Sequence, residues 1–335
     1  MCYTYFNYIG ILTEVEMDYP FDKKSVFMVT GGAGFIGSNI CEKLVNAGYE
    51  VRCLDDLSNG KYENIAGLKN DGNFTFIKGD IRDFEVCLKA CEGVDYILHN
   101  AALGSVVESM EKPELYEAVN VHGMENMIKA AVENKVKKFV FASSAAVYGD
   151  AGERIAKEGK EGNPLSVYAE TKLKNEITAK KYADCIDVYG LRYFNVYGKR
   201  QRHDSSYSAV IPNFASKLIK GEQVCINGDG LQTRDFVYVD DVVQANLKAC
   251  LADSKFSGEA FNIACGTETS IKELYYVLAN ILGVKKEPAY GPGIKGDIRF
   301  SCADISKAEG MLGYKPEYAF DEGIKASAQW YKNNI

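Results

Sequence analysis

The 335-residue sequence lacks the Cys/His clusters whose spacing is typical of metal sites. It has only three histidines, His99, His122 and His203, and its ten cysteines include no Cys-x-x-Cys pair. Cys87 and Cys91 come closest, one helical turn apart, which is typical of the buried face of a helix. We therefore expect no metal ion, reduced thiols and a cytoplasmic location.

Long apolar runs and basic runs are also missing. No stretch of about 18 apolar residues is present, so we expect no membrane partner. The net charge is −7, and no Lys/Arg-rich run accompanies it, which argues against nucleic acid as a partner. Residues 1–23 lack the basic start and unbroken apolar stretch of a signal peptide, and we interpret them as an N-terminal extension that packs on the surface.

The composition, 47% hydrophobic and 25% charged, is that of a globular protein with a full core. Short apolar segments alternate with helical stretches, and we predict strands at 25–30, 49–55, 74–80, 94–99, 138–144 and 186–195. This alternation predicts an α/β fold with a doubly wound parallel sheet. Beyond the sixth strand the regularity falls, and the tail from residue 270 carries two amphipathic helices, which indicates a smaller, mixed α/β C-terminal lobe.

Glycines follow the first predicted strand at positions 31, 34 and 37. In a strand–turn–helix crossing, Gly31 permits the tight turn, Gly34 lets a pyrophosphate approach the backbone, and Gly37 lets the helix pack closely. The helix predicted at 39–47 then offers its N-terminal N–H groups and the positive end of its dipole to phosphate.

Polar and small residues end or follow the other predicted strands. Asp55 lies 24 residues after Gly31, close to the position of an acid that hydrogen-bonds the ribose of a dinucleotide and repels a 2′-phosphate. The sequence therefore predicts NAD rather than NADP. Asp80, Ala101 and Ser144 occupy equivalent places, and because parallel strands share one carboxyl edge, these residues should meet in one crevice.

A helix is predicted to begin at Ser166, a good N-cap residue, with Glu170 in its first turn. Tyr168 and Lys172 then lie about one turn apart on the same face. A phenol has an ordinary pKa of about 10, and a fixed ammonium beside it would favour the phenolate. The spacing alone also fits an aromatic residue beside a solvated lysine. The convergence of the strand-end residues on one crevice favours Tyr168 as a catalytic base.

Thr30–Gly37, Ser144 and the Tyr168-x-x-x-Lys172 pair resemble the extended short-chain dehydrogenase/reductase family over nearly the whole chain after residue 24. Residues 79–82, 143–149 and 192–198 are similar to its nucleotide-sugar enzymes. Residues 102–106, 209–212, 226–230 and 233–236 resemble the C4-epimerases of UDP-N-acetylhexosamines.

The resemblance implies NAD-dependent C4 epimerisation of UDP-GlcNAc or UDP-GalNAc through a 4-keto intermediate. Tyr168, as a phenolate beside Lys172, would take the proton of the sugar 4-hydroxyl, and Ser144 would hydrogen-bond that hydroxyl. The implied cofactor residues are Gly31, Gly34, Phe35, Ile36, Gly37, Asp55, Asp56, Ser58, Asn59, Gly60, Asp80, Ile81, Ala101, Ala102, Asn120, Tyr168, Lys172 and Tyr193. The implied substrate residues are Gly104, Ser105, Ser144, Asn195, Gln201, Ala209, Val210, Asn227, Arg234, Asp297 and Ser301.

The same resemblance implies how the chain is divided and assembled. We expect a Rossmann NAD-binding domain at 24–190 plus 236–265, and a nucleotide-sugar-binding lobe at 191–235 plus 266–335. Relatives pair through the helices that contain Asn120 and Tyr168, so we expect a homodimer, with Met127, Leu173 and Ile177 exposed.

Departures from the family pattern leave other activities open. Ala145 and Ala146 stand where the nearest relatives have serines, and Ile294 stands where the family usually has an arginine. A UDP-glucose or UDP-glucuronate 4-epimerase is therefore an alternative. A 4,6-dehydratase would need an acid–base pair at 145–146 and is disfavoured. An NAD-binding sensor without turnover is the alternative from another class, although such proteins usually lose the Tyr or the Lys.

Overall fold

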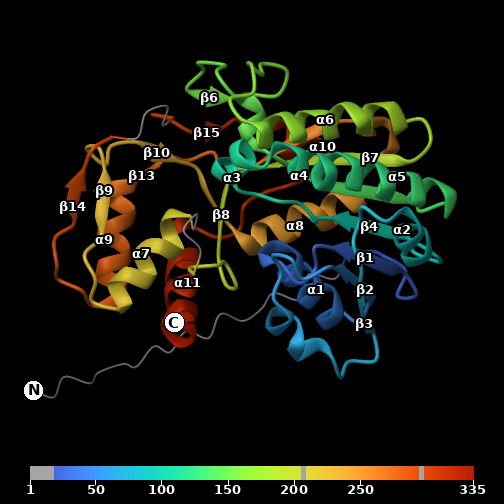
Figure 1. The fold of residues 1–335 in the computed structure, drawn as a ribbon, viewed down its shortest axis with the longest axis horizontal. Helices are drawn as coiled ribbons and strands as arrows, with labels where there is room; N and C mark the ends of the chain where they lie inside the picture. Colours follow the sequence, from blue (N-terminus) through green and yellow to red (C-terminus); the bar gives the residue numbers. More distant parts are fainter. Residues whose placement is uncertain (1–18, 205–208, 294–297) are drawn as a thin grey trace, which may run out of the picture.

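The computed structural model describes residues 19–204, 209–293 and 298–335. A parallel sheet of seven strands forms its centre, in the order β12-β7-β5-β4-β1-β2-β3 (Figure 1). These strands are β1 (Val26–Thr30), β2 (Glu50–Asp55), β3 (Phe74–Lys78), β4 (Tyr96–His99), β5 (Lys138–Ser144), β7 (Asp187–Tyr193) and β12 (Ala260–Ile263). The predicted doubly wound α/β fold is confirmed.

Helices cover both faces of this sheet. One layer contains α1 (Phe35–Asn46), α8 (Val239–Cys250) and α10 (Ser306–Leu312), and the other contains α2 (Phe84–Ala90), α5 (Gly123–Glu133) and α6 (Val167–Tyr182). Successive side chains of β1 pack on opposite faces of the sheet. Phe27 and Val29 belong to the core beneath α1 and α8, and Met28 belongs to the core beneath α2 and α5. A strand buried on both faces explains the continuous apolar run in the sequence.

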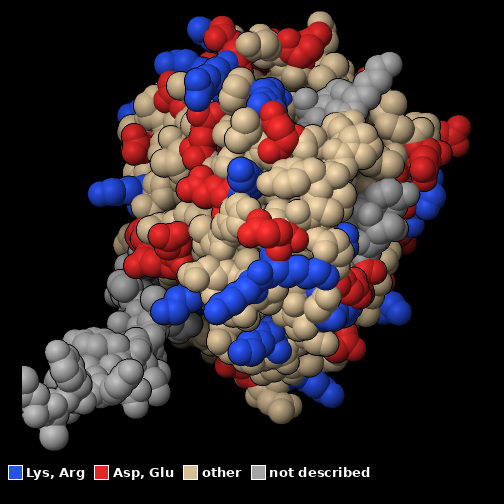
Figure 2. Space-filling model, turned by 90° about the vertical axis from the view of Figure 1, so that its left-hand side faces the viewer, with Lys and Arg blue, Asp and Glu red and all other residues tan. Residues whose placement is uncertain are grey.

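A smaller lobe lies to the left of the sheet in Figure 1. It contains α7 (Val210–Ile219), α9 (Ile271–Leu282), α11 (Phe320–Asn334), β9 (Cys225–Asn227) and β14 (Ala289–Gly291). Leu218, Leu274, Tyr275 and Ile324 belong to its apolar core. Acidic and basic side chains are interspersed with uncharged surface on the face of the molecule in Figure 2.

The start of α1 and the helices of the tail differ from those predicted. α1 begins at Phe35 rather than Asn39, because close packing of Gly37 on Gly31 overrides the low helix propensity of glycine. The tail carries three helices, not two, within the described residues; the missed helix α10 is short and buries only Ala308 and Leu312.

The sixth predicted strand splits at Phe194. Its first part is β7, while β8 (Asn195–Tyr197) pairs with β11 (Phe236–Tyr238) outside the central sheet. The domain boundary expected between residues 190 and 191 falls inside β7, whose last residues still pair with β5. The division into two domains stays a prediction.

Of the predicted extension, residues 1–18 lie outside the described part of the chain. Tyr19 and Phe21 are buried, and the Phe21 ring packs 5.1 Å, centroid to centroid, from Phe27. Among the residues that the structure describes, no helix is long and apolar enough to cross a membrane.

Candidate functional site

Ser144, Tyr168 and Lys172 meet where β5 ends and α6 begins. Ser166 caps α6, as predicted, by accepting a hydrogen bond from the Ala169 N–H at 3.1 Å. Lys172 Nζ lies 5.8 Å from the centroid of the Tyr168 ring, and the Ser144 hydroxyl lies close enough to the phenol to lower its pKa. The structure thus brings the three predicted catalytic side chains together; their roles stay a prediction.

The electrostatics of this cluster differ from the expectation. Burial raises the pKa of the Tyr168 phenol, and the hydrogen bond with Ser144 offsets only part of that rise. Burial also lowers the pKa of Lys172 to about 8, while its Nζ donates to the Ala142 carbonyl at 2.8 Å. Because the pKa of this phenol lies above its ordinary value of about 10, the groups around it do not by themselves form the phenolate at neutral pH.

His99, the last residue of β4, is buried near Lys172. It is 4% exposed, and its Nδ1 lies 2.7 Å from the Thr30 hydroxyl. Burial, together with the charge of Lys172, lowers the pKa of His99 to about 3. The imidazole is therefore neutral at physiological pH.

A groove of about 90 Å³, which we call the strand-end groove, lies at the carboxyl edge of β1, β2 and β4. Eleven residues of the implied cofactor site line it: Gly31, Gly34, Asp55, Asp56, Ser58, Asn59, Gly60, Asp80, Ile81, Ala101 and Ala102. Gly79, Asn100, Leu103 and Val119 also line it and were not predicted. Of these, Asn100 directly follows a strand, a signal that could have identified it.

The floor of the strand-end groove has no room for larger side chains. Gly31 has φ +65°, and a Cβ there would lie 2.7 Å from the Ala101 nitrogen. The Asp55 carboxylate is fixed at the wall by the N–H groups of Ala33 and Leu57, at 2.9 and 2.8 Å. A glycine floor at a helix N-terminus with an acid beside it fits the pyrophosphate and ribose of NAD.

Seven of the implied cofactor residues do not line this groove. Phe35, Ile36 and Gly37 form the first turn of α1. Asn120 is buried, and its amide binds the backbone N–H and carbonyl of Leu103 at 2.8 and 3.0 Å. The Tyr193 hydroxyl donates to Asn100 at 3.2 Å and accepts from Asn246 at 2.8 Å. Asn120 and Tyr193 therefore support residues of the groove. Tyr168 and Lys172 lie in the cluster described above.

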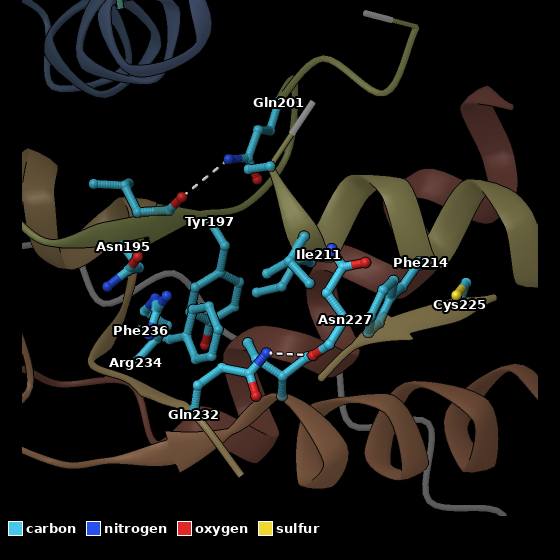
Figure 3. A pocket seen from close by; sticks show the side chains of 14 residues that line it. Asn195, Tyr197, Gln201, Ile211, Phe214, Cys225, Asn227, Gln232, Arg234 and Phe236 are labelled. Carbon is cyan, nitrogen blue, oxygen red and sulfur yellow. Dashed lines mark hydrogen bonds between the residues drawn. The ribbon is translucent and has the colours of Figure 1, made fainter. Parts of the chain in front are cut away.

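A second pocket, the lobe pocket, has a volume of about 450 Å³ and lies beside α7 and β9 (Figure 3). Six of the implied substrate residues line it: Asn195, Gln201, Ala209, Val210, Asn227 and Arg234. Figure 3 shows Asn195 and Arg234 on one side and Asn227 near Phe214 on the other. Tyr197, Phe214 and Phe236 add an apolar wall that was not predicted.

A third hollow joins these two. Its lining includes Gly104 and Ser105, shares Gly34 and Asn59 with the strand-end groove, and shares Ala209 and Gln201 with the lobe pocket. The groove and the lobe pocket are thus parts of one continuous depression.

Ser301 lies elsewhere, in a pocket of about 330 Å³ that Ala145 and Phe194 also line; we call it the Ala145 pocket. Arg299 lines it too, and its guanidinium pairs with Asp229 at 2.8 and 3.0 Å. Asp297 and Ile294 lie outside the described residues.

Comparisons with known proteins agree with this arrangement. Residues 27–264 match the model of the NAD dependent epimerase/dehydratase family. The solved UDP-N-acetylglucosamine 4-epimerase from Methanobrevibacter ruminantium M1, in complex with UDP-N-acetylmuramic acid, is 36% identical with a TM-score of 0.89, covering 94% of this chain and 100% of that one. The UDP-glucose 4-epimerase of Mycolicibacterium smegmatis is 37% identical over 91% of this chain and 98% of its own. The UDP-glucuronate 4-epimerase of Thermodesulfobacterium geofontis is 32% identical over 92% and 96%.

A family match over most of the chain, a shared fold and a groove that fits NAD lead to one conclusion. The chain belongs to the NAD dependent epimerase/dehydratase family.

Proposed function

We propose that this enzyme interconverts UDP-GlcNAc and UDP-GalNAc by C4 epimerisation through a 4-keto sugar. The observation that carries the proposal is the Ser144–Tyr168–Lys172 cluster at the same sheet edge as a depression that runs from the strand-end groove to the lobe pocket. The lobe pocket, with its apolar wall and polar rim, has a volume suited to a nucleotide. The three relatives are 4-epimerases of different UDP-sugars, which supports the reaction more strongly than the choice of sugar.

In this proposal Tyr168 takes the proton of the sugar 4-hydroxyl and later returns it. Bound NAD supplies a reversible acceptor for the hydrogen at C4. Ser144 holds the 4-hydroxyl in place through a hydrogen bond. Lys172, whose pKa is about 8, is mostly protonated at neutral pH, and we assign its charge the role of favouring the phenolate when substrate and NAD are bound.

Small side chains favour an N-acetylated sugar. Ala145 directly follows Ser144 and lines the Ala145 pocket together with Ser301, so space is available next to the segment that carries Ser144. Gly104 and Ala209 in the joining hollow are equally small. UDP-glucose or UDP-glucuronate remains the second candidate, because the relatives from M. smegmatis and T. geofontis carry those names.

The proposal is tested by measuring kcat/KM for UDP-GlcNAc, UDP-glucose and UDP-glucuronate with the wild-type enzyme and Ser301→Tyr. Filling the Ala145 pocket should lower kcat/KM for UDP-GlcNAc about tenfold or more and leave that for UDP-glucose within about threefold. Asn70→Tyr, at an exposed turn before β3, is the control and should change neither. An equal effect of Ser301→Tyr on both sugars would contradict the assigned pocket.

We also propose a homodimer formed through α6 and its neighbours. Ile177 on α6 is 47% exposed, and Val107 and Met110 on α3 (Val106–Glu111) are 55% and 61% exposed. Exposed apolar side chains on neighbouring helices are typical of an interface. The expected exposure of Met127 was wrong, because Met127 is fully buried between α5 and the sheet, and Leu173 is only partly exposed.

A further inference from the structure

The helix that carries Tyr168 and Lys172 rests on the sheet with a polar inward face. Its buried side chains include Thr171, Lys172, Asn175 and Glu176. Apolar packing is non-directional, so it contributes little to fixing such a face in one position. The position of α6 over β5 must therefore depend on directed hydrogen bonds and ion pairs.

The most extensive of these contacts is a buried ion pair between α6 and β7. Glu176 lies one turn after Lys172 and about two turns after Tyr168, on the same face of α6. Arg192 donates to its carboxylate through Nε at 2.8 Å and Nη2 at 2.7 Å. The side chains are 5% and 7% exposed. A two-point contact of this kind fixes orientation as well as distance.

The same network reaches the segment that carries Ser144 from both sides. The Ser143 hydroxyl donates to Glu176 Oε1 at 2.6 Å. Tyr148, four residues after Ser144, accepts from Arg192 Nη1 at 2.9 Å and donates to Asn262 at 2.6 Å. One carboxylate thus holds both the residue before Ser144 and the helix of Tyr168.

We infer that Glu176 and Arg192 are positioning residues, which fix the height of α6 over β5 and so keep the Ser144 hydroxyl beside the Tyr168 phenol. Neither residue touches the reacting atoms. The inference rests on the proposed roles of Ser144 and Tyr168.

A loss of this positioning should change the acidity of the phenol as well as the rate. The groups that face it are Ser144 from β5 and Lys172 from its own helix; the charge of Lys172 also lowers the pKa of His99 on β4, which keeps that imidazole neutral. The hydrogen bond with Ser144 lowers the pKa of Tyr168. If Ser144 moves away, that pKa rises, and the enzyme needs a higher pH to form the phenolate.

Ser143→Ala is the mildest test, because it removes one bond to Glu176 and leaves the ion pair intact. We expect kcat to fall about three- to tenfold, KM for the UDP-sugar to stay within about twofold, and the acid limb of the pH profile of kcat to move to higher pH. Ser327→Ala is the matched control: Ser327 is also fully buried and donates to Gly323 at 2.8 Å, but in α11. It should lower the melting temperature without changing kcat or the pH profile.

Tyr148→Phe removes the hydrogen bonds on the C-terminal side of Ser144 without leaving a charge unpaired. As for Ser143→Ala, we expect kcat to fall and the acid limb of its pH profile to move to higher pH. Glu176→Gln should give a larger loss of kcat. Its melting temperature is measured beside its rate, because the variant removes one of the two carboxylates, Glu176 and Glu161, that pair with the buried Arg192. Unchanged kcat and pH profiles in both Ser143→Ala and Tyr148→Phe would overturn the inference. A wild-type enzyme that epimerises no UDP-sugar would overturn the proposed function, and the inference with it.

Discussion

Gly31 lies so close to Ala101 that the backbone of Ala101 leaves no room for a side chain at position 31. A Cβ on Gly31 would lie 2.7 Å from the Ala101 nitrogen and 2.8 Å from its Cα, and the φ of Gly31 is +65°. The turn after β1 therefore requires glycine for two reasons, backbone conformation and space.

Gly31→Ala should disrupt this turn and weaken NAD binding. We expect the purified variant to retain much less NAD than the wild type, and its melting temperature to fall. The control is Gly310→Ala, in α10, where a Cβ meets nothing within 4 Å and should slightly stabilise the helix. Wild-type NAD content in Gly31→Ala would contradict the assignment of the strand-end groove to the cofactor.

Tyr168→Phe should abolish turnover and leave the fold intact. The variant removes the hydroxyl that we propose as acid and base, so we expect kcat to fall by about 10²- to 10⁴-fold. NAD content and melting temperature should stay close to those of the wild type. The control is Tyr276→Phe on α9. The Tyr276 hydroxyl donates a hydrogen bond to Glu287 at 2.6 Å. Unchanged sugar conversion by Tyr168→Phe would show that the base lies elsewhere.

The free energy of unfolding should depend on pH through Asp241. This carboxyl group on α8 is fully buried, accepts from the Glu317 N–H at 2.7 Å, and has a pKa raised by burial from 3.8 to about 7. Between these pH values the folded chain binds the proton more strongly than the unfolded chain, so this group's contribution to stability falls as pH rises.

The stabilising contribution of Asp241 is complete below about pH 4 and lost by about pH 7. Asp241→Asn keeps an acceptor for Glu317 but does not titrate. Urea unfolding at pH 5 and pH 8 should therefore show a smaller decrease in stability for the variant than for the wild type. Equal decreases would mean that Asp241 titrates at its ordinary pKa.

The proposed dimer predicts a mass of about twice 37.0 kDa by light scattering at micromolar concentration. Ile177→Glu places a charge on the proposed interface of α6 and should shift the protein toward the monomer. Tyr290→Glu alters a residue of similar exposure, 50%, on β14 in the other lobe, and should leave the mass unchanged. A monomeric wild-type protein would rule out the dimer.

Most of the central sheet could be predicted because its strands are buried on both faces, which leaves clear apolar runs in the sequence. Helix boundaries were less predictable. The start of α1 depends on the contact of Gly37 with Gly31, which overrides the local preference of glycine, and α10 buries too few residues to show a clear period.

The strand-end groove also followed from topology, because parallel strands deliver their ends to one edge. The lobe pocket could be foreseen only in part. Tyr197, Phe214 and Phe236 come from three distant segments, and only tertiary packing brings them to one wall. The hydrogen bond from Lys172 to the Ala142 carbonyl could not be predicted either. Spacing shows which residues share a helical face, but not which atom a lysine ammonium group contacts.

The most direct test of the proposed function follows UDP-GlcNAc carrying deuterium at C4 by NMR during incubation with the NAD-loaded enzyme in ordinary water. The account predicts that UDP-GalNAc forms and that the deuterium stays at C4, because the hydrogen removed there is returned without exchange with solvent. UDP-glucose should be converted much more slowly. Conversion of UDP-glucose alone, or a product that has lost its deuterium to water, would contradict the account.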